Sequence, residues 1–352
     1  MKKLASLFLV LVLAVTFIVC GKAPTEVTAN PITAKEVGVT TEGLKPVRLG
    51  LIVQPMNNIF YVVLKDAAEA YAATLEGVEI TVLDGKNIEE QIKVFEDFAS
   101  TMPDAMGVAA IDATAMIPAI NGAGELGVPV FCVDNNCPDA ERESYIGTDN
   151  LLGAEEMAKW IIDRLGGEGK IAIVEGPGGS YNSNIRKEGL NNIFTTVENN
   201  IEIVARVTAN WRRDEALNVT NDILTANPVQ LDMVVALNDE MASGCMEAIK
   251  ANNRQNDVQL IGYNGVPEAI KNVYEGGFQA TVVQYPEVMA KTFIDNAVAL
   301  VRDGVVPEQE ILIPATVVDT ELIRAVVDDN LKATNESEET LYAKLRQFYD
   351  GQ

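Results

Sequence analysis

Short apolar runs and amphipathic stretches alternate along most of this chain. Leu49–Val53 is an apolar run of the length of a buried strand, and from Phe60 onward apolar residues recur at helical spacing. The pattern repeats downstream, with strands predicted at 47–53, 79–83, 105–110, 128–133, 170–175, 201–208, 233–236, 259–262 and 280–283 and helices at 59–75, 88–101, 114–126, 150–166, 184–197, 213–226, 239–252, 266–275 and 286–303. This alternation predicts an α/β fold with parallel sheets covered by helices on both faces.

Residues at the ends of these elements agree with the prediction. Asp239 is expected to cap the helix that follows it, and Gly127 and Gly166 stand where helices should stop. Pro286 can open the last long helix from its first turn. Residues 145–150 separate one series of strand–helix units from a second, so the chain is expected to contain two similar halves.

Both ends of the chain differ from this middle part. Lys2 and Lys3 precede the apolar stretch 4–19, which is shorter than the roughly 20 residues of a spanning helix and ends at Cys20. An apolar stretch ending in Cys and Gly resembles a bacterial lipoprotein signal with Cys20 lipidated. Cleavage near Ala23 and an uncleaved anchor are the alternatives, and all three export the chain. Residues 21–46 are expected to be a flexible tether, and the polar tail 331–352 has no assigned role.

Composition narrows the function. The chain has 352 residues and a formal net charge of −24, and this charge argues against binding to nucleic acid. It contains no histidine, which removes serine and cysteine nucleophiles activated by histidine and zinc sites ligated by histidine. No cysteine spacing is typical of a metal site, so we expect neither a metal nor a cofactor. Because histidine is missing, we expect a binding protein rather than an enzyme, although Asp, Glu, Lys or Arg alone could still carry catalysis.

Three cysteines lie beyond the signal segment. Cys132 and Cys137 are close enough in sequence to form a disulfide in an oxidising compartment, and two unpaired thiols are the alternative. Cys245 lies among apolar residues of a predicted helix and is expected in the core.

Amides and aromatic residues collect where predicted strands end. In a parallel sheet these ends open on one edge, where open α/β sheets bind ligands. Any one of these residues is more often a turn former, but their number on one edge favours a site. Aromatic rings beside amides suit a hydroxyl-rich molecule, since the rings cover its apolar face and the amides both donate and accept. The polar residues are Gln54, Asn58, Asp134, Asn135, Asn238, Asp239, Asn264 and Gln284.

Four segments carry a resemblance to a known family. They are Asn-Asn-Ile-Phe-Tyr at 57–61, Tyr-Ile-Gly-Thr-Asp-Asn at 145–150, Asn-Asp-Glu-Met-Ala at 238–242 and Gly-Tyr-Asn-Gly at 262–265. In this order and spacing, over about residues 47–318, the chain resembles sugar-binding periplasmic proteins of the ribose/galactose type. The resemblance implies a type I periplasmic binding protein, with two Rossmann-like lobes, each a parallel sheet with helices on both faces, joined by a three-crossing hinge.

The resemblance also implies boundaries and site residues. The N-terminal lobe would comprise 47–148 plus 285–314, and the C-terminal lobe 149–284 plus 315–330, with crossings near 148–150, 283–285 and 314–316. The family's binding positions map onto Gln54, Asn58, Phe60, Tyr61, Asp134, Asn135, Arg186, Trp211, Asn238, Asn264 and Gln284.

Physical roles follow for several of these residues. Phe60 and Trp211 are expected to sandwich a sugar ring, while Asp134 and Arg186 would form charge-assisted hydrogen bonds to hydroxyls. A surface aromatic and a helix-surface charge are the alternatives for Trp211 and Arg186. The loop 176–180 lacks the residues of a phosphate-binding loop, so its glycines are expected to serve a tight turn.

Two positions depart from the family pattern. The family often has Arg where this chain has Asn135, and Asp where this chain has Asn264. Each departure replaces a charge with an amide, so the site is still expected to bind a polyol, but the ligand need not be ribose.

The resulting hypothesis is an extracytoplasmic, lipid-anchored monomer that captures a monosaccharide or related polyol by hinge closure and delivers it to the membrane permease of an ABC importer. The same fold could instead serve as a ligand sensor for a chemoreceptor or a membrane kinase. An enzyme of the sugar or nucleoside class and the effector domain of a lactose-repressor-type regulator are further alternatives. The missing histidine disfavours the first, and the export signal disfavours the second.

Overall fold

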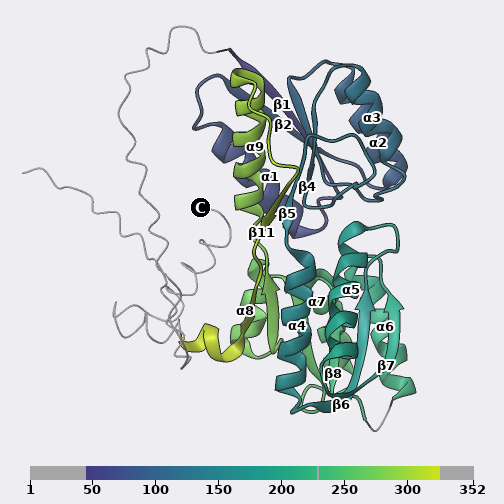
Figure 1. Cartoon of the computed structure of the whole chain (residues 1–352). Helices are drawn as coiled ribbons and strands as arrows, with labels where there is room; N and C mark the ends of the chain where they lie inside the picture. Colours follow the sequence, from purple (N-terminus) through teal and green to yellow (C-terminus); the bar gives the residue numbers. More distant parts are fainter. Residues whose placement is uncertain (1–44, 228–229, 326–352) are drawn as a thin grey trace, which may run out of the picture. The chain divides into compact units, whose positions relative to one another are not determined.

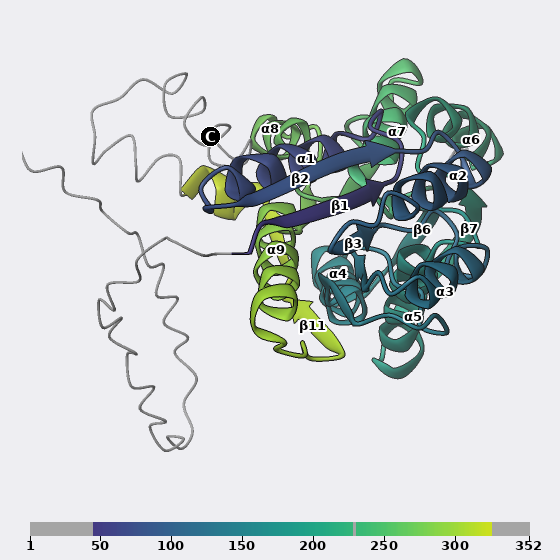
Figure 2. The same cartoon turned by 90° about the horizontal axis from the view of Figure 1, so that it is seen from above.

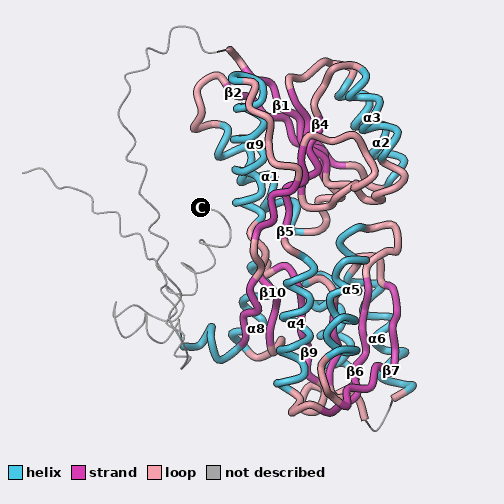
Figure 3. Tube along the Cα trace, in the orientation of Figure 1, coloured by secondary structure: helices cyan, strands magenta, loops and turns pink. Residues whose placement is uncertain are grey.

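The structure is a computed structural model that describes residues 45–227 and 230–325. These residues form two six-stranded sheets, each built from alternating strands and helices (Figure 1; Figure 3). We call the part built on the first sheet the N lobe and the part built on the second sheet the C lobe. The predicted signal segment with Cys20, residues 21–44 of the tether, residues 326–330 of the predicted C-terminal lobe and the tail 331–352 lie outside the described residues.

The N-lobe sheet has the order β11-β5-β4-β3-β1-β2, and all its neighbouring strands are parallel. Its strands are β1 (Val47–Val53), β2 (Val78–Asp84), β3 (Ala105–Val108), β4 (Val130–Val133), β5 (Ser144–Thr148) and β11 (Glu310–Ile313). Helices α1 (Ile59–Ala72) and α9 (Pro286–Asp303) pack together on one face, and α2 (Ile88–Ala99) and α3 (Ile117–Glu125) cover the other (Figure 1; Figure 2 from above).

The C-lobe sheet has the order β12-β10-β9-β8-β6-β7. Its strands are β6 (Glu168–Glu175), β7 (Asn200–Thr208), β8 (Met233–Ala236), β9 (Gln259–Asn264), β10 (Ala280–Val283) and β12 (Thr316–Asp319). Helices α4 (Asn150–Arg164) and α5 (Tyr181–Thr196) pack together, as do α6 (Arg213–Ala226) and α7 (Asp239–Ala251), while α8 (Pro267–Glu275) lies against β10.

One strand breaks the expected parallel arrangement. β12 pairs with β10 in antiparallel fashion, so the second sheet is mixed rather than wholly parallel. The reason is topological. β10 ends where the chain leaves for the N lobe, and β12 begins where the chain returns from β11 after only two residues, so the two strands run in opposite directions.

The chain passes between the sheets three times, from β5 to α4, from β10 to α9 and from β11 to β12. This confirms the predicted fold of two Rossmann-like lobes joined by a three-crossing hinge. One hydrogen bond connects two of the crossings: Thr148 Oγ1 donates to Gln284 Oε1 at 2.7 Å.

Most predicted elements are present, with shifted ends. β5 and β12 were not predicted as strands, and α5 begins at Tyr181 rather than at residue 184 because Ser180 caps it. The disulfide is absent. Cys132 and Cys137 are buried free thiols, and Cys245 is buried as expected and accepts a hydrogen bond from Thr220 Oγ1 at 3.2 Å. In the described ranges, no helix is both long enough and apolar enough to cross a membrane.

The predicted cap of α7 is wrong by one residue. Asn238 is the cap and accepts a hydrogen bond from the Met241 amide at 2.8 Å. Asp239 is instead the first helical residue and is buried, with its carboxylate accepting hydrogen bonds from Thr281 Oγ1 at 2.8 Å and the Val266 amide at 3.0 Å. Both residues are good caps in isolation, and the neighbouring strand β10 decides between them by offering Thr281 to Asp239.

Burial raises the pKa of Asp239 to about 7. The hydrogen bonds that its carboxylate accepts lower the pKa, and the negative charge of Glu240 raises it further. Since the folded protein then holds this proton more tightly than the unfolded chain, the contribution of Asp239 to stability is full below about pH 4 and is lost as the pH rises to about 7.

We therefore predict that Asp239→Asn gains free energy of unfolding relative to the wild type as the pH rises from about 4 to 7, by up to roughly 4 kcal/mol. Urea denaturation at a series of pH values measures this difference. Asp222→Asn, an exposed carboxylate on α6, is the control and should show no such divergence. A pH-independent difference for Asp239→Asn would contradict the prediction.

Candidate functional site

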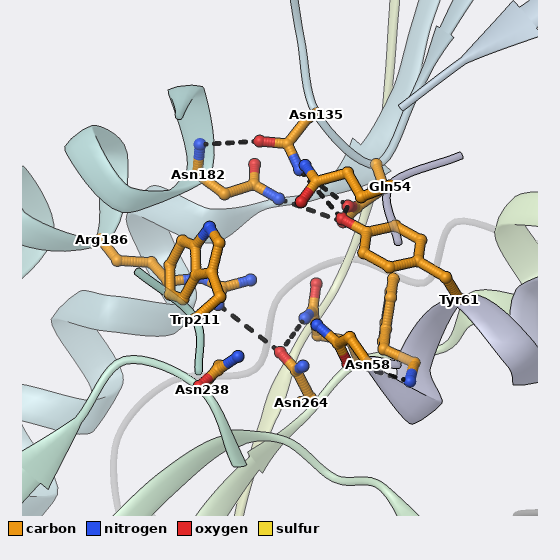
Figure 4. A pocket seen from close by; sticks show the side chains of 12 residues that line it. Gln54, Asn58, Tyr61, Asn135, Asn182, Arg186, Trp211, Asn238 and Asn264 are labelled. Atoms are coloured by element: carbon orange, nitrogen blue, oxygen red, sulfur yellow. Dashed lines mark hydrogen bonds between the residues drawn. The ribbon is translucent and has the colours of Figure 1, made fainter. Parts of the chain in front are cut away.

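A small cavity lies between the two lobes, where strands of both sheets end. The space in it that a water-sized molecule can reach is about 20 Å³, room for about one water molecule. All eleven binding positions implied by the family resemblance line this cavity, together with Asn182, which was not predicted (Figure 4). Asp239, also expected among the polar residues at the strand ends, does not line it.

Residues of β1 and α1 form one wall. Gln54 follows β1, and its Nε2 donates to the Ala110 carbonyl at 2.9 Å, which leaves its Oε1 as an acceptor. Asn58 caps α1 by accepting a hydrogen bond from the Phe60 amide at 3.1 Å. The cap places Phe60 and Tyr61 in the first helical turn, where their rings meet edge to face with centroids 5.3 Å apart.

Asp134 is a buried carboxylate that follows β4. It adopts a φ of 65°, a left-handed conformation that is unusual for a residue with a side chain. It accepts hydrogen bonds from the Tyr61 hydroxyl at 2.8 Å, from Asn135 Nδ2 at 2.9 Å and from Asn182 Nδ2 at 3.0 Å. Burial raises the pKa of Asp134, while Arg186 and the three donors oppose the shift.

Several hydrogen bonds, which we call the cross-lobe bonds, join the lobes beside the cavity. The side-chain oxygen of Asn135 accepts from Ser180 Oγ at 3.1 Å and from the Asn182 amide at 3.3 Å, and Asn182 donates to Asp134 (Figure 4). Farther out, the Ala113 amide donates to the Gly179 carbonyl at 3.0 Å. An added Cβ on Gly179 would lie 1.9 Å from Asp112 Oδ2, so glycine at this position permits close approach of the lobes.

Asn182 has both ends of its amide engaged, since its oxygen also accepts from Asn150 Nδ2 at 3.1 Å. The sequence contained a signal for this residue. Ser180 is a good helix cap, and if α5 starts there, Asn182 lies on the same face as Arg186, four residues later. A helix that starts at residue 184, as predicted, leaves Asn182 outside it.

Arg186 is a buried guanidinium at the centre of the C-lobe wall, not the surface charge that was its alternative. Its Nε donates to Asn150 Oδ1 at 2.8 Å and its Nη1 donates to the Leu237 carbonyl at 2.7 Å, with a longer contact to Asn264 Oδ1 at 3.5 Å. Its Cζ lies 3.8 Å from the centroid of the Tyr263 ring, in cation–π contact.

The remaining polar wall comes from three residues at strand ends. Asn238 uses its oxygen as the cap of α7, and its buried Nδ2 has no hydrogen-bond partner in the described part of the chain. Asn264 follows Tyr263 at the end of β9, with a φ of 133°. Its oxygen accepts from Gln284 Nε2 at 2.7 Å. A buried donor without a partner is costly, so Asn238 is aimed at a group that the protein itself does not supply.

Trp211 enters the cavity from the turn before α6. It and Asn210 have φ values of 63° and 49°, left-handed conformations that cost energy for residues with a side chain and that cluster at functional sites. An added Cβ on Gly176 would lie 2.2 Å from the Trp211 ring, so glycine is required there. The following Arg212 and Arg213 pair with acidic side chains, among them Asp214 and Glu268. Among the described residues, no group of three or more His, Cys, Asp or Glu side chains is placed to hold a metal.

Comparison with known proteins agrees with this fold. A family model described as "Periplasmic binding protein domain" matches residues 49–304. The chain is 31% identical over 254 residues to the ribose import binding protein RbsB of Bacillus subtilis, covering 72% of this chain and 81% of that protein. It is 29% identical over 273 residues to the xylitol-binding protein of Mycolicibacterium smegmatis, covering 77% of each chain.

Solved structures give the same result. An ABC transporter periplasmic solute binding protein from Actinobacillus succinogenes with bound D-allose superposes with a TM-score of 0.74 at 30% identity, over 80% of this chain and all of that one. The Caulobacter myo-inositol binding protein bound to myo-inositol superposes with a TM-score of 0.75 at 28% identity, over 80% of this chain and 98% of that one. The chain therefore belongs to the periplasmic binding protein family, and it is a binding protein rather than an enzyme.

Proposed function

We propose that this protein is an extracytoplasmic solute-binding protein that captures a monosaccharide or related polyol between its lobes and delivers it to an ABC importer. One observation carries the proposal. The cavity combines three aromatic side chains with a wall of amides, and the Asn238 Nδ2 donor in that wall is buried without a partner. A hydroxyl or ring oxygen of a sugar is the acceptor that this donor lacks.

The relatives support the choice of ligand class. Those named above are described as binding ribose, xylitol, D-allose and myo-inositol, all of which are small and rich in hydroxyls. In this proposal the eleven predicted residues and Asn182 contact the ligand or position the residues that do. Phe60 and Trp211 cover its apolar faces, and Asp134 and Arg186 form the charge-assisted hydrogen bonds.

The proposed mechanism is hinge closure. The two bodies are residues 47–148 plus 285–314 and residues 149–284 plus 315–330, and they move about the three crossings. The cross-lobe bonds form only when the lobes meet, so a ligand that contacts both lobes binds the closed state better and increases its population. The importer's membrane subunits would then recognise the closed protein.

Trp211 provides a direct test, because the chain has two tryptophans and Trp160 donates to Asp319 Oδ2 outside the cavity. We predict that D-ribose, D-allose, xylitol, myo-inositol or a related sugar acid shifts the emission of Trp160→Phe and that the shift is absent in Trp211→Phe. Trp211→Ala should lower affinity roughly 30-fold, equivalent to about 2 kcal/mol of lost ring burial. Calorimetry showing unchanged affinity for Trp211→Ala would refute the role of this ring.

Closure is tested at Asn182. Asn182→Ala removes the hydrogen bond across the cavity to Asp134 and should weaken ligand affinity roughly tenfold, since a hydrogen bond to a charged group contributes about 1.5 kcal/mol or more. Small-angle X-ray scattering of the wild type should show a smaller radius of gyration with ligand. Asn184→Ala is the matched control on the same helix, where the exposed Asn184 donates only to the Gly178 carbonyl. Equal losses in both variants would count against closure through Asn182.

The lipid anchor is the part of the proposal that rests on Cys20. We predict that Cys20→Ser moves the protein from the membrane fraction to the soluble fraction and abolishes incorporation of labelled fatty acid. Mass spectrometry of the mature amino terminus separates this from cleavage near Ala23. Unchanged fractionation of the variant would mean that another feature holds the protein at the membrane.

A further inference from the structure

Three amides on one side of the cavity have their oxygens committed to the protein. Asn58 Oδ1 accepts from the Phe60 amide, Asn238 Oδ1 accepts from the Met241 amide, and Asn264 Oδ1 accepts from Gln284 Nε2. In the first two residues a helix amide fixes which end of the side chain is the oxygen. Each residue therefore turns its –NH₂ group away from these partners, and an –NH₂ group can only donate.

Arg186 belongs to the same side, because its Nη1 contacts Asn264 Oδ1. A guanidinium has five donors and no acceptor. We call Asn58, Arg186, Asn238 and Asn264 the donor end of the cavity. Figure 4 shows Asn58, Asn238 and Asn264 together, separated from Gln54, Tyr61 and Asn135.

The opposite side has the acceptors. Gln54 Nε2 donates to the Ala110 carbonyl, so Gln54 Oε1 remains available to accept a hydrogen bond. Asp134 is a carboxylate whose three protein donors are Tyr61, Asn135 and Asn182, all at that side. Asn135, Asn182 and Gln284 have both ends of their amides bonded within the protein, so they do not change this polarity.

Helix geometry adds to the donor end. Asn58 and Asn238 are the caps of α1 and α7, which have 14 and 13 residues, so two helix amino termini lie at this end of the cavity. Helix amino termini favour negative charge. The buried and unpartnered Asn238 Nδ2 lies at one of these termini and lines the cavity.

A ligand hydroxyl at the donor end would accept a hydrogen bond but would find no protein acceptor for its own proton. The oxygens of a carboxylate only accept hydrogen bonds, so a carboxylate leaves no donor without a partner at this end. Its hydrogen bonds to Arg186 are also charge-assisted, so they are stronger than those of a neutral group. We propose, on the basis of the proposed function, that the ligand is a sugar acid, a monosaccharide with a carboxylate at the donor end and hydroxyls toward Gln54 and Asp134.

Asn264 is then a specificity-determining residue. An aspartate at this position would keep one oxygen facing Gln284 and Arg186 and would turn a second oxygen, an acceptor, toward the ligand. That change would suit a hydroxyl and repel a carboxylate. The chain has an amide there instead, which is one of the two departures from the ribose-type pattern.

The test is calorimetry of the purified protein with matched pairs of ring sugars that differ only at C6: D-glucose and D-glucuronate, and D-galactose and D-galacturonate. We expect the affinity for at least one acid to be roughly tenfold or more above that for its neutral partner. Asn264→Asp should reverse the preference, with roughly a 100-fold loss for the acid and a gain for the neutral sugar.

The outcomes separate this inference from the function on which it rests. Binding of a neutral sugar with affinity equal to or above that of its acid overturns the sugar-acid inference and leaves the proposed function standing. Binding of no member of any pair, and of no polyol in the panel above, overturns both. Loss of all binding in Asn264→Asp, with an unchanged melting temperature, assigns Asn264 to general affinity and overturns its role in specificity.

Discussion

The buried guanidinium of Arg186 is the interaction around which the C-lobe side of the cavity is arranged. A charge removed from water must be surrounded by hydrogen-bond partners and favourable contacts, or it destabilises the fold. Arg186 finds them in Asn150 at the first hinge crossing, in the Leu237 carbonyl after β8 and in the ring of Tyr263 within β9. Satisfying one cation thus fixes the relative positions of a hinge segment and two strand ends.

From Arg186 the hydrogen bonds continue in both directions. Asn150 donates to Asn182, which donates to Asp134 in the N lobe. Through Asn264 the network reaches Gln284 and Thr148, which belong to two different crossings. The ligand cavity and the hinge are therefore one connected network, and a group that enters the cavity can alter the same bonds that set the angle between the lobes.

Much of this could be predicted from the sequence, because polar residues at the ends of apolar runs mark the open edge of a parallel sheet. Gln54, Asn238 and Gln284 were found in this way, and family resemblance added Arg186 and Trp211. What could not be predicted depends on contacts between distant segments. Nothing local distinguishes Asn238 from Asp239 as a cap until Thr281 is placed beside Asp239. Likewise, the direction of β12 follows from the path of the chain through the other lobe, not from its own residues.

The path of the chain also bears on how the molecule is made. α9 and β11, which complete the N-lobe sheet and its helical cover, come from residues 286–313, after nearly all of the C lobe, and β12 then completes the C-lobe edge. Neither lobe has its full set of strands until almost the entire described chain has been synthesised. Each sheet is therefore completed by pairing between residues far apart in the sequence, and contacts of this kind slow folding.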